Sequence, residues 1–189
     1  VPVVDYRSDG TVLVLGPGTI GQTIARAASW RGARRVVVVG LNDTVRLRTA
    51  MQVGATHTID LADTPDLAKA FYAITGGEPA DVVLEATGHP TSIEQGMKLL
   101  RKRGIFVVAG IHPDAVKVDV TAMVRSRQQM RGSHSSPRSS WERVARRVAE
   151  TPEDVRPMVS LQLPLAQALE GFERCVSRDV SKVVLLPTA

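Results

Sequence analysis

The stretch of this chain with the clearest chemical potential is Val12–Gly21, where apolar, mostly β-branched residues lead directly into the glycine pattern G-x-G-x-x-G. Gly16 permits a tight turn after a strand, and Gly18 lets a phosphate group approach the backbone because it has no Cβ. Gly21 lets the following helix pack closely on the sheet, and the N-terminus of that helix offers free N–H groups and a positive dipole end. This order of strand, glycine turn and helix predicts a dinucleotide-binding site.

The composition limits the classes of protein to which the chain can belong. With 189 residues, 43% hydrophobic and 23% charged, it has room for one well-packed domain and part of another. The net charge is +5, but the arginines are scattered and only 4% of the residues are aromatic, so we expect no nucleic-acid binding. No apolar run approaches the roughly 20 residues of a membrane span and no signal peptide is visible, so we expect no membrane association. The single cysteine, Cys175, excludes an internal disulfide, is typical of a cytoplasmic protein and is expected to be packed.

Strand-like and helix-like patterns alternate along the first four-fifths of the chain. Four consecutive valines at 36–39 indicate a strand that is buried on both faces, as in a parallel sheet. The alternation predicts an α/β fold with a doubly wound parallel (Rossmann) sheet of about six strands. The expected strands are 11–15, 35–39, 56–59, 81–86, 105–109 and 129–132, with a possible edge strand at 116–120. The expected helices are 19–31, 44–53, 66–75, 90–100 and 140–150.

The pattern changes after residue 150, where Pro152 and Pro157 interrupt the chain. We therefore expect three parts: a lead-in segment at 1–10, a dinucleotide-binding domain at 11–147 and a C-terminal segment at 148–189. A helix at 165–176 and a strand at 182–186 are expected in the last part.

The end of the second predicted strand bears on the choice of cofactor. Folds of this kind usually carry a carboxylate there, about 20 residues after the glycines, which binds the ribose hydroxyls of NAD. This chain has Gly40 instead, so no charge repels a 2′-phosphate; Asn42 can donate to that phosphate, and Arg46 or Arg48 can reach it. The sequence therefore favours NADP over NAD. The alternative is that Asp43 supplies the carboxylate and restores NAD binding, the two arginines being plain exposed helix residues.

Six blocks in a fixed order identify a resemblance: 12–21, 50–56, 81–88, 103–110, 131–133 and 181–185. Together they resemble the cofactor-binding part of the medium-chain dehydrogenase/reductase superfamily, specifically its zinc-type alcohol, polyol and threonine dehydrogenases. The resemblance covers essentially the whole chain. It implies that the zinc ligands and the proton relay lie on a preceding domain, outside this chain, and that the C-terminal segment returns to complete that domain. We therefore expect no catalytic residue and no metal ligand here.

The resemblance also implies the contacts of a nicotinamide dinucleotide. At the pyrophosphate they are Gly16, Pro17, Gly18, Thr19 and Lys182, with Gly21 closing the turn. At the nicotinamide end they are Ile20, behind the ring, and the backbone of Gly110, Ile111, Ser133 and Ser135. At the adenosine end they are Thr87, Gly88 and His89.

Each of these roles has a simpler alternative. Ile20 is equally consistent with a core residue, His89 with a turn residue before a proline, and Lys182 with a surface charge. Glu85 is interpreted as structural and not as a general base. The other histidines, His57, His112 and His134, are isolated and lack the spacing of metal ligands.

The resemblance implies an NADP(H)-binding half of a zinc-type alcohol or polyol dehydrogenase, inactive alone, whose intact enzyme converts a small alcohol or ketone. Two alternatives are the cofactor domain of a zinc-independent quinone or enoyl reductase and a non-catalytic dinucleotide-sensing module. A short-chain reductase is rejected, because Tyr6 and Tyr72 are the only tyrosines and neither forms Tyr-x-x-x-Lys after the fourth strand. The resemblance further implies a homodimer or tetramer, for which the stretch 116–133 is the candidate sheet edge.

Overall fold

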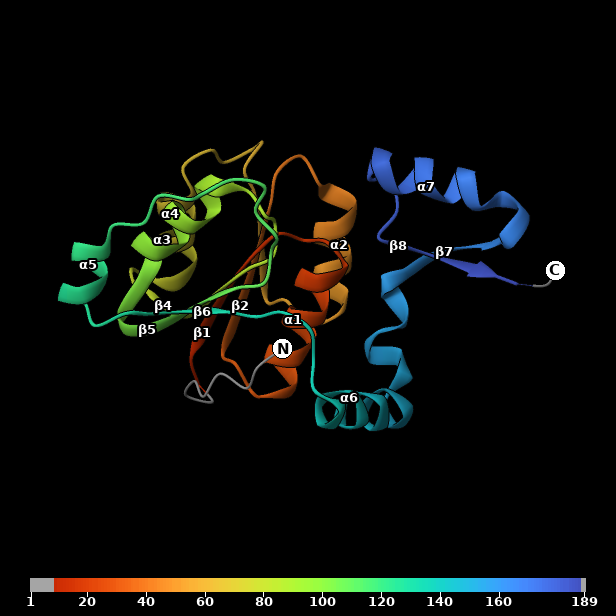
Figure 1. Ribbon diagram of the computed structural model, residues 1–189, viewed down its shortest axis with the longest axis horizontal. Coiled ribbons are helices and arrows are strands. Elements are labelled where there is room, and N and C mark those ends of the chain that lie inside the picture. The colour runs from red at the N-terminus through yellow and green to blue at the C-terminus, as the bar shows by residue number, and fades with distance from the viewer. Residues whose placement is uncertain (1–8, 188–189) are drawn as a thin grey trace.

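The computed structural model describes residues 9–187, so most of the expected lead-in segment lies outside the described residues. Its main body is a six-stranded parallel sheet in the order β3-β2-β1-β4-β5-β6, with helices on both faces (Figure 1). The strands are β1 (Thr11–Leu15), β2 (Arg35–Gly40), β3 (His57–Asp60), β4 (Ala80–Glu85), β5 (Leu100–Val108) and β6 (Gln129–Gly132). The helices are α1 (Thr19–Trp30), α2 (Thr44–Gln52), α3 (Leu67–Thr75), α4 (Pro90–Leu99), α5 (Val120–Arg125) and α6 (Arg138–Glu150). The expected doubly wound parallel fold is confirmed.

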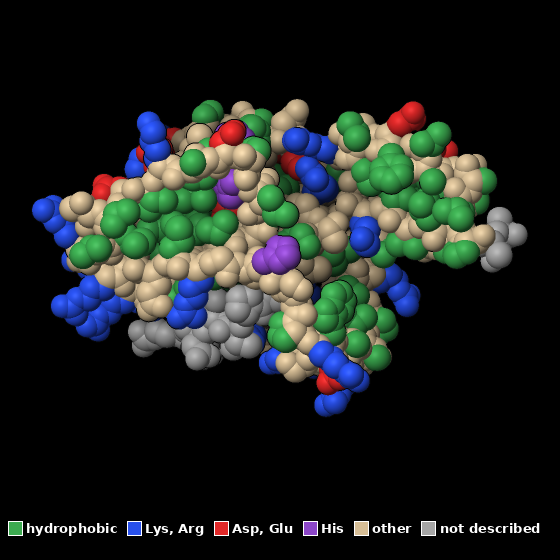
Figure 2. Space-filling model, in the orientation of Figure 1, with side chains coloured by type: hydrophobic (Ala, Val, Ile, Leu, Met, Phe, Trp, Pro, Cys, Tyr) green, Lys and Arg blue, Asp and Glu red, His purple; other side chains and the backbone are tan. Residues whose placement is uncertain are grey.

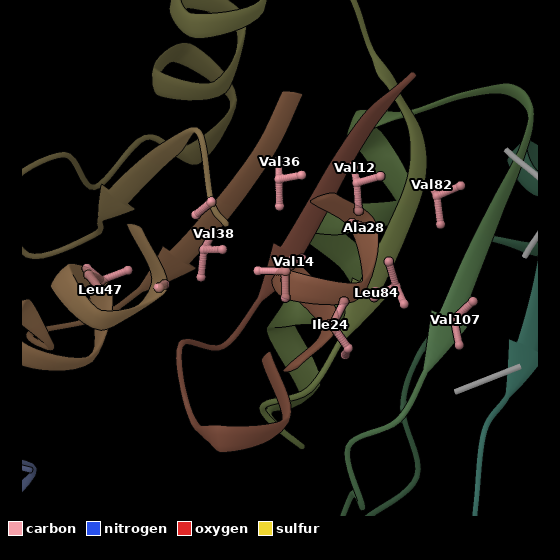
Figure 3. Close-up of a cluster of buried hydrophobic side chains, with 13 residues drawn as sticks. Val12, Val14, Ile24, Ala28, Val36, Val38, Leu47, Val82, Leu84 and Val107 are labelled. Carbon is pink, nitrogen blue, oxygen red and sulfur yellow. The ribbon is translucent and has the colours of Figure 1, made fainter. Parts of the chain in front are cut away.

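The valine-rich strands form this sheet because successive side chains point to opposite faces, so each strand supplies two cores. Val12, Val14, Val36 and Val38 pack on one side with residues of α1 and α2 (Figure 3). Their odd-numbered neighbours pack on the other side with residues of α3 and α4, including the fully buried Phe71. The strand order reverses between β1 and β4, and the carboxyl ends of these two strands are where such sheets bind ligands.

The expected edge strand at 116–120 is wrong. Residues 116–119 have no regular structure, and Val120 already belongs to α5, whose N-cap Asp119 accepts a hydrogen bond from Ala122 N at 2.9 Å. Val116 and Val118 alternate with polar residues because a loop packs them against the core. The period of two therefore reflects one-sided packing and not strand pairing.

The C-terminal segment forms a small unit of its own. It contains η1 (Pro152–Asp154), η2 (Arg156–Met158), β7 (Val159–Pro164), η3 (Leu165–Gln167), α7 (Ala168–Ser177) and β8 (Lys182–Leu186). The strand β7, which the sequence did not indicate, pairs in parallel with β8, and the expected helix from 165 begins as a 3-10 turn. Cys175 is exposed, contrary to expectation, because α7 buries only Gly171 against the small sheet.

A polar clamp holds this segment to α1. Asp154 of η1 accepts hydrogen bonds from Trp30 Nε1 at 2.5 Å and from Arg26 at 3.1 Å. The guanidinium groups of Arg26 and Arg147 lie 5.4 and 5.6 Å from the centre of the Trp30 ring, within the range of cation–π attraction. The hydrogen bond from Trp30 is the largest influence on the pKa of Asp154 and lowers it. The hydrogen bond from Thr151 and the charges of Arg26 and Arg147 lower this pKa further, and together these effects outweigh burial.

Among the described residues, no helix has the length and apolar character needed to span a bilayer.

Candidate functional site

The turn after β1 requires glycine at two positions. Gly16 has φ +106°, and a Cβ there would lie 2.9 Å from Thr87 Cγ2 and 3.1 Å from the Ala86 carbonyl. A Cβ on Gly21 would lie 1.8 Å from the Gly16 carbonyl oxygen, so helix α1 can start this close to the turn only without a side chain. Both glycines therefore serve the fold of the turn itself.

Gly18 is different, because the fold alone does not require a glycine there. Its φ is −66°, and a Cβ would meet only Arg46 Nη1, at 3.7 Å. Gly18 is the N-cap of α1, whose first N–H groups have no acceptor within the helix. Ile20, in the first turn, is 55% exposed, so the alternative that it is a core residue is wrong. The turn thus presents open backbone, a positive helix end and an exposed aliphatic side chain together.

Of the two arginines on α2, Arg46 borders this turn. It donates two hydrogen bonds to Asp43, whose side chain is 2% exposed. Arg48, two residues further along the helix, lines a groove between α2 and α3 instead. The carboxylate of Asp43 is directed into the protein, so in this conformation it does not take the place of the carboxylate missing at the end of β2.

The loop after β2 is held by Asp60 at the end of β3. The Asp60 carboxylate accepts hydrogen bonds from Asn42 N at 2.7 Å and Asp43 N at 3.0 Å. Burial raises the pKa of Asp60, but the N–H groups of Asp43, Ala62 and Asn42 outweigh it and keep the pKa below its usual value. The backbone at Asn42, with φ +50°, is therefore held in place by Asp60.

At Gly40 a side chain would be tightly packed. A Cβ there would lie 3.0 Å from Pro17 Cγ and 3.2 Å from Leu47. Both neighbours would have to move to admit an aspartate or glutamate. The packing of Pro17 and Leu47 around Gly40 thus disfavours a carboxylate side chain at this position.

The carboxyl ends of β4 and β5 are joined by Glu85, whose side chain is fully buried. One carboxylate oxygen accepts hydrogen bonds from Thr87 N at 2.6 Å, Thr87 Oγ1 at 2.5 Å and Gly88 N at 2.9 Å. The other lies 3.0 Å from His112 Nε2. This geometry agrees with the structural interpretation of Glu85.

The loops that Glu85 joins bring four of the expected site residues together, namely Thr87, Gly88, Gly110 and Ile111. A Cβ on Gly88 would lie 2.5 Å from Ile111 O, and a Cβ on Gly110 would lie 2.4 Å from Gly88 N. Thr87 is tied to the same carboxylate, and Ile111 is 82% exposed. His112, which the sequence left without a role, is therefore part of the support of this loop pair, although no sequence signal connects it with Glu85.

The remaining expected residues are His89, Ser133, Ser135 and Lys182. His89 is the N-cap of α4 and its ring contacts Thr91 Oγ1 at 2.9 Å, so the turn interpretation stays open. Ser133 N donates to Val108 O at 2.8 Å, and Ser135, two residues later, has φ +60°. Lys182 is exposed at the start of β8.

Gln22, on the first turn of α1, is a residue that sequence reasoning missed. It is completely buried and donates to Pro17 O at 2.8 Å. The only signal in the sequence is its spacing of three residues from Ala25 and six from Ala28, which places it on the buried face of α1.

The described part of the chain contains no group of three or more His, Cys, Asp or Glu side chains that could hold a metal ion.

Comparisons with known proteins agree with this geometry. The family model described as zinc-binding dehydrogenase matches residues 19–150. The chain is 34% identical to L-threonine 3-dehydrogenase of Bacillus subtilis over 182 residues, which cover 94% of this chain and 51% of that protein. It is 30% identical to sorbitol dehydrogenase of Halalkalibacterium halodurans, over 93% of this chain and 51% of that protein.

A solved structure, an alcohol dehydrogenase from Thermotoga maritima, matches with a TM-score of 0.84 and 30% identity, over 93% of this chain and 49% of that chain. The chain thus spans about half the length of the relatives it matches. With its fold, its glycine turn and a family match over residues 19–150, the chain belongs to the zinc-binding dehydrogenase family.

Proposed function

We propose that this chain is the NADP(H)-binding half of a zinc-type alcohol or polyol dehydrogenase and holds the nicotinamide for hydride transfer. The observation that carries the proposal is the glycine turn, where the open backbone of Gly18, the N-terminus of α1 and Arg46 border one surface. Positive charge and free N–H groups on one surface suit a phosphate. The names of the relatives support a dehydrogenase as the whole protein.

In this proposal each set of residues has one task. The backbone of residues 16–21 and the side chain of Lys182 bind the pyrophosphate, and Thr87, Gly88 and His89 contact the adenosine. Gly110, Ile111, Ser133 and Ser135 hold the carboxamide, while Ile20 presses on the nicotinamide ring. The bound cofactor supplies hydride chemistry, and these residues orient it and shield one face of the ring from water.

The preference for NADP(H) is supported by the loop after β2. Gly40 offers no negative charge, and its packing against Pro17 and Leu47 leaves little room for one. We propose that Asn42, in the loop after β2, and Arg46, on α2, donate hydrogen bonds to the 2′-phosphate of the adenosine ribose. Arg46 holds the Asp43 carboxylate through Nε and Nη2, which weakens the alternative of NAD binding, and its Nη1 is the atom that borders Gly18.

The test is a titration of the chain with NADPH and with NADH, followed by the fluorescence of the reduced nicotinamide. We expect tighter binding of NADPH. Arg46→Gln, which can still donate to Asp43, should weaken NADPH binding about tenfold, the equivalent of about 1.4 kcal/mol, and leave NADH binding nearly unchanged. Arg48→Gln, the same change on the other side of α2, should alter neither. Tighter binding of NADH by the unmodified chain would contradict the preference.

The catalytic part of the enzyme is proposed to lie outside this chain. No metal cluster is available among the described residues, so no zinc-dependent step is assigned to them. Leu169, Phe172 and Val176 on α7 are 79%, 67% and 82% exposed, and Figure 2 shows hydrophobic side chains gathered over this helix and its small sheet. We propose that the catalytic half covers this face, that it holds zinc and the alcohol or ketone substrate, and that the chain alone is inactive.

We also propose that the intact protein is a dimer or tetramer joined through the β6 edge of the sheet. β6 is the last strand in the sheet order, and Val120 and Val124 of the neighbouring α5 are 58% and 66% exposed. An unpaired strand edge beside apolar side chains favours pairing with a second copy. Light scattering at high protein concentration should give at least twice the mass of the chain, and replacing Met130 in β6 by proline, which removes an N–H group, should reduce that mass. A monomer at all concentrations would contradict this proposal.

A further inference from the structure

The amide of Gln22 joins three parts of the molecule that lie far apart in the sequence. Its Nε2 donates to Pro17 O at 2.8 Å and lies 3.4 Å from Arg46 O, and its Oε1 accepts a hydrogen bond from Ser181 Oγ at 2.8 Å. Gln22 is 0% exposed and Ser181 is 8% exposed. Both ends of a buried amide are therefore used, one by the glycine turn and α2 and the other by the C-terminal segment.

Ser181 extends this contact into the small sheet. Its N–H donates to Ser160 Oγ in β7 at 2.8 Å, and the next residue, Lys182, begins β8. Hydrogen bonds thus run without interruption from Pro17 in the glycine turn, through Gln22 and Ser181, to β7. Leaving a buried polar group without its hydrogen-bond partner costs free energy. A shift of Ser181 would therefore destabilise the present position of the Gln22 amide.

The bond to Pro17 bears directly on the backbone that faces the phosphate. The peptide that joins Pro17 to Gly18 is planar and trans, so its carbonyl and its N–H point in opposite directions. Anchoring the carbonyl of Pro17 on Gln22 therefore sets the direction of the Gly18 N–H. That group is one of the donors at the start of α1.

We infer that Gln22 and Ser181 are positioning residues that couple the pyrophosphate-binding backbone to the placement of the C-terminal segment. This inference rests on the proposed function, because it assumes that the turn binds a dinucleotide pyrophosphate. Neither residue contacts the cofactor. By thermodynamic reciprocity, cofactor binding in turn holds the C-terminal segment, and with it Lys182, in its docked position.

A double-mutant cycle on the 189-residue chain tests the coupling. Gln22→Met keeps the length of the side chain and removes its hydrogen bonds, and Ser181→Ala removes one hydroxyl. The Kd for NADPH, from nicotinamide fluorescence, should rise about fivefold in each single variant. In the double variant it should rise no further than in Gln22→Met, because Ser181 acts through Gln22. The same two changes at exposed positions, Gln52→Met and Ser139→Ala, serve as controls and should leave the Kd unchanged.

Two outcomes would overturn the coupling. In the first, the single variants leave the Kd for NADPH unchanged and lower only the urea midpoint, which shows a purely structural contact. In the second, the double variant raises the Kd about 25-fold, because two independent fivefold losses multiply. An unmodified chain that binds neither NADPH nor NADH overturns the proposed function instead. If Gln22→Met does not fold, amide hydrogen exchange is compared between the unmodified chain and Ser181→Ala at Gly16 and Gln22, whose N–H groups donate to Val39 O and Gly18 O at 2.9 Å each. Faster exchange in the variant supports the coupling, and equal exchange overturns it.

Discussion

Replacing Gly18 by valine is expected to abolish dinucleotide binding while leaving the chain folded. The backbone of Gly18 has φ −66°, which suits any residue, and a new Cβ would meet only Arg46 Nη1, at 3.7 Å. The fold therefore tolerates the side chain. Pyrophosphate binding does not tolerate it, because the phosphate reaches the N–H groups of α1 by passing over the Cα of Gly18. The Kd for NADPH should rise at least about 100-fold, equivalent to about 2.8 kcal/mol, with little change in the urea midpoint.

A comparison variant is Gly21→Ala, which should lower the urea midpoint as well as weaken NADPH binding, because it distorts the turn itself. Its Cβ would stand 1.8 Å from the Gly16 carbonyl oxygen, so the start of α1 must shift. Such overpacking typically costs about 1–3 kcal/mol or more, and the urea midpoint should fall accordingly. If Gly18→Val retains its affinity for NADPH, the dinucleotide does not bind at the glycine turn.

Replacing Glu85 by leucine is expected to destabilise the chain strongly, by about 3 kcal/mol or more. The variant leaves the N–H groups of Thr87 and Gly88 and the ring of His112 without their buried acceptor. Because Gly110 packs against the same carboxylate, the loops at the ends of β4 and β5 should separate, and NADPH binding should weaken in the fraction that stays folded. Urea unfolding followed by circular dichroism measures the first effect, and fluorescence titration measures the second.

Two further variants separate the role of this carboxylate from a general effect of charge. Glu85→Gln keeps one oxygen that can accept from Thr87 and Gly88, so its loss of stability should be intermediate. Glu78→Gln changes an exposed glutamate paired with Arg34 and Arg35 and should leave the midpoint close to that of the unmodified chain. A Glu85→Leu variant as stable as Glu78→Gln would show that the loops do not depend on the buried carboxylate.

Local patterns in the sequence were sufficient to predict much of the fold. β1, the glycine turn and α1 follow one another within 20 residues, and their glycine and valine positions encode the turn and the two-sided burial directly. The prediction of secondary structure failed at two places, where the residue pattern did not reflect strand pairing. Val116 and Val118 alternate as in a strand but pack from a loop, and β7 went unnoticed because its burial is partial.

The candidate site could be predicted only where its residues are neighbours in the chain. Arg46 and Arg48 look equivalent in the sequence, and only the rotation of α2 about its axis brings the first, and not the second, to the glycine turn. Glu85 and His112 are 27 residues apart, and Gln22 and Ser181 are 159 apart. Local propensities contain no information about contacts at such distances.

By itself, then, the sequence determined the class of fold, the position of the glycine turn and the absence of a carboxylate at residue 40, because each depends on residue types within one or two elements. The tertiary structure decided which charged and polar side chains share the turn. The strand order β3-β2-β1-β4-β5-β6 places the ends of β4 and β5 side by side, and the docking of the C-terminal segment brings Ser181 to Gln22. Those contacts arise from how whole elements pack, and buried polar groups then hold them because an unpaired partner in the interior is costly.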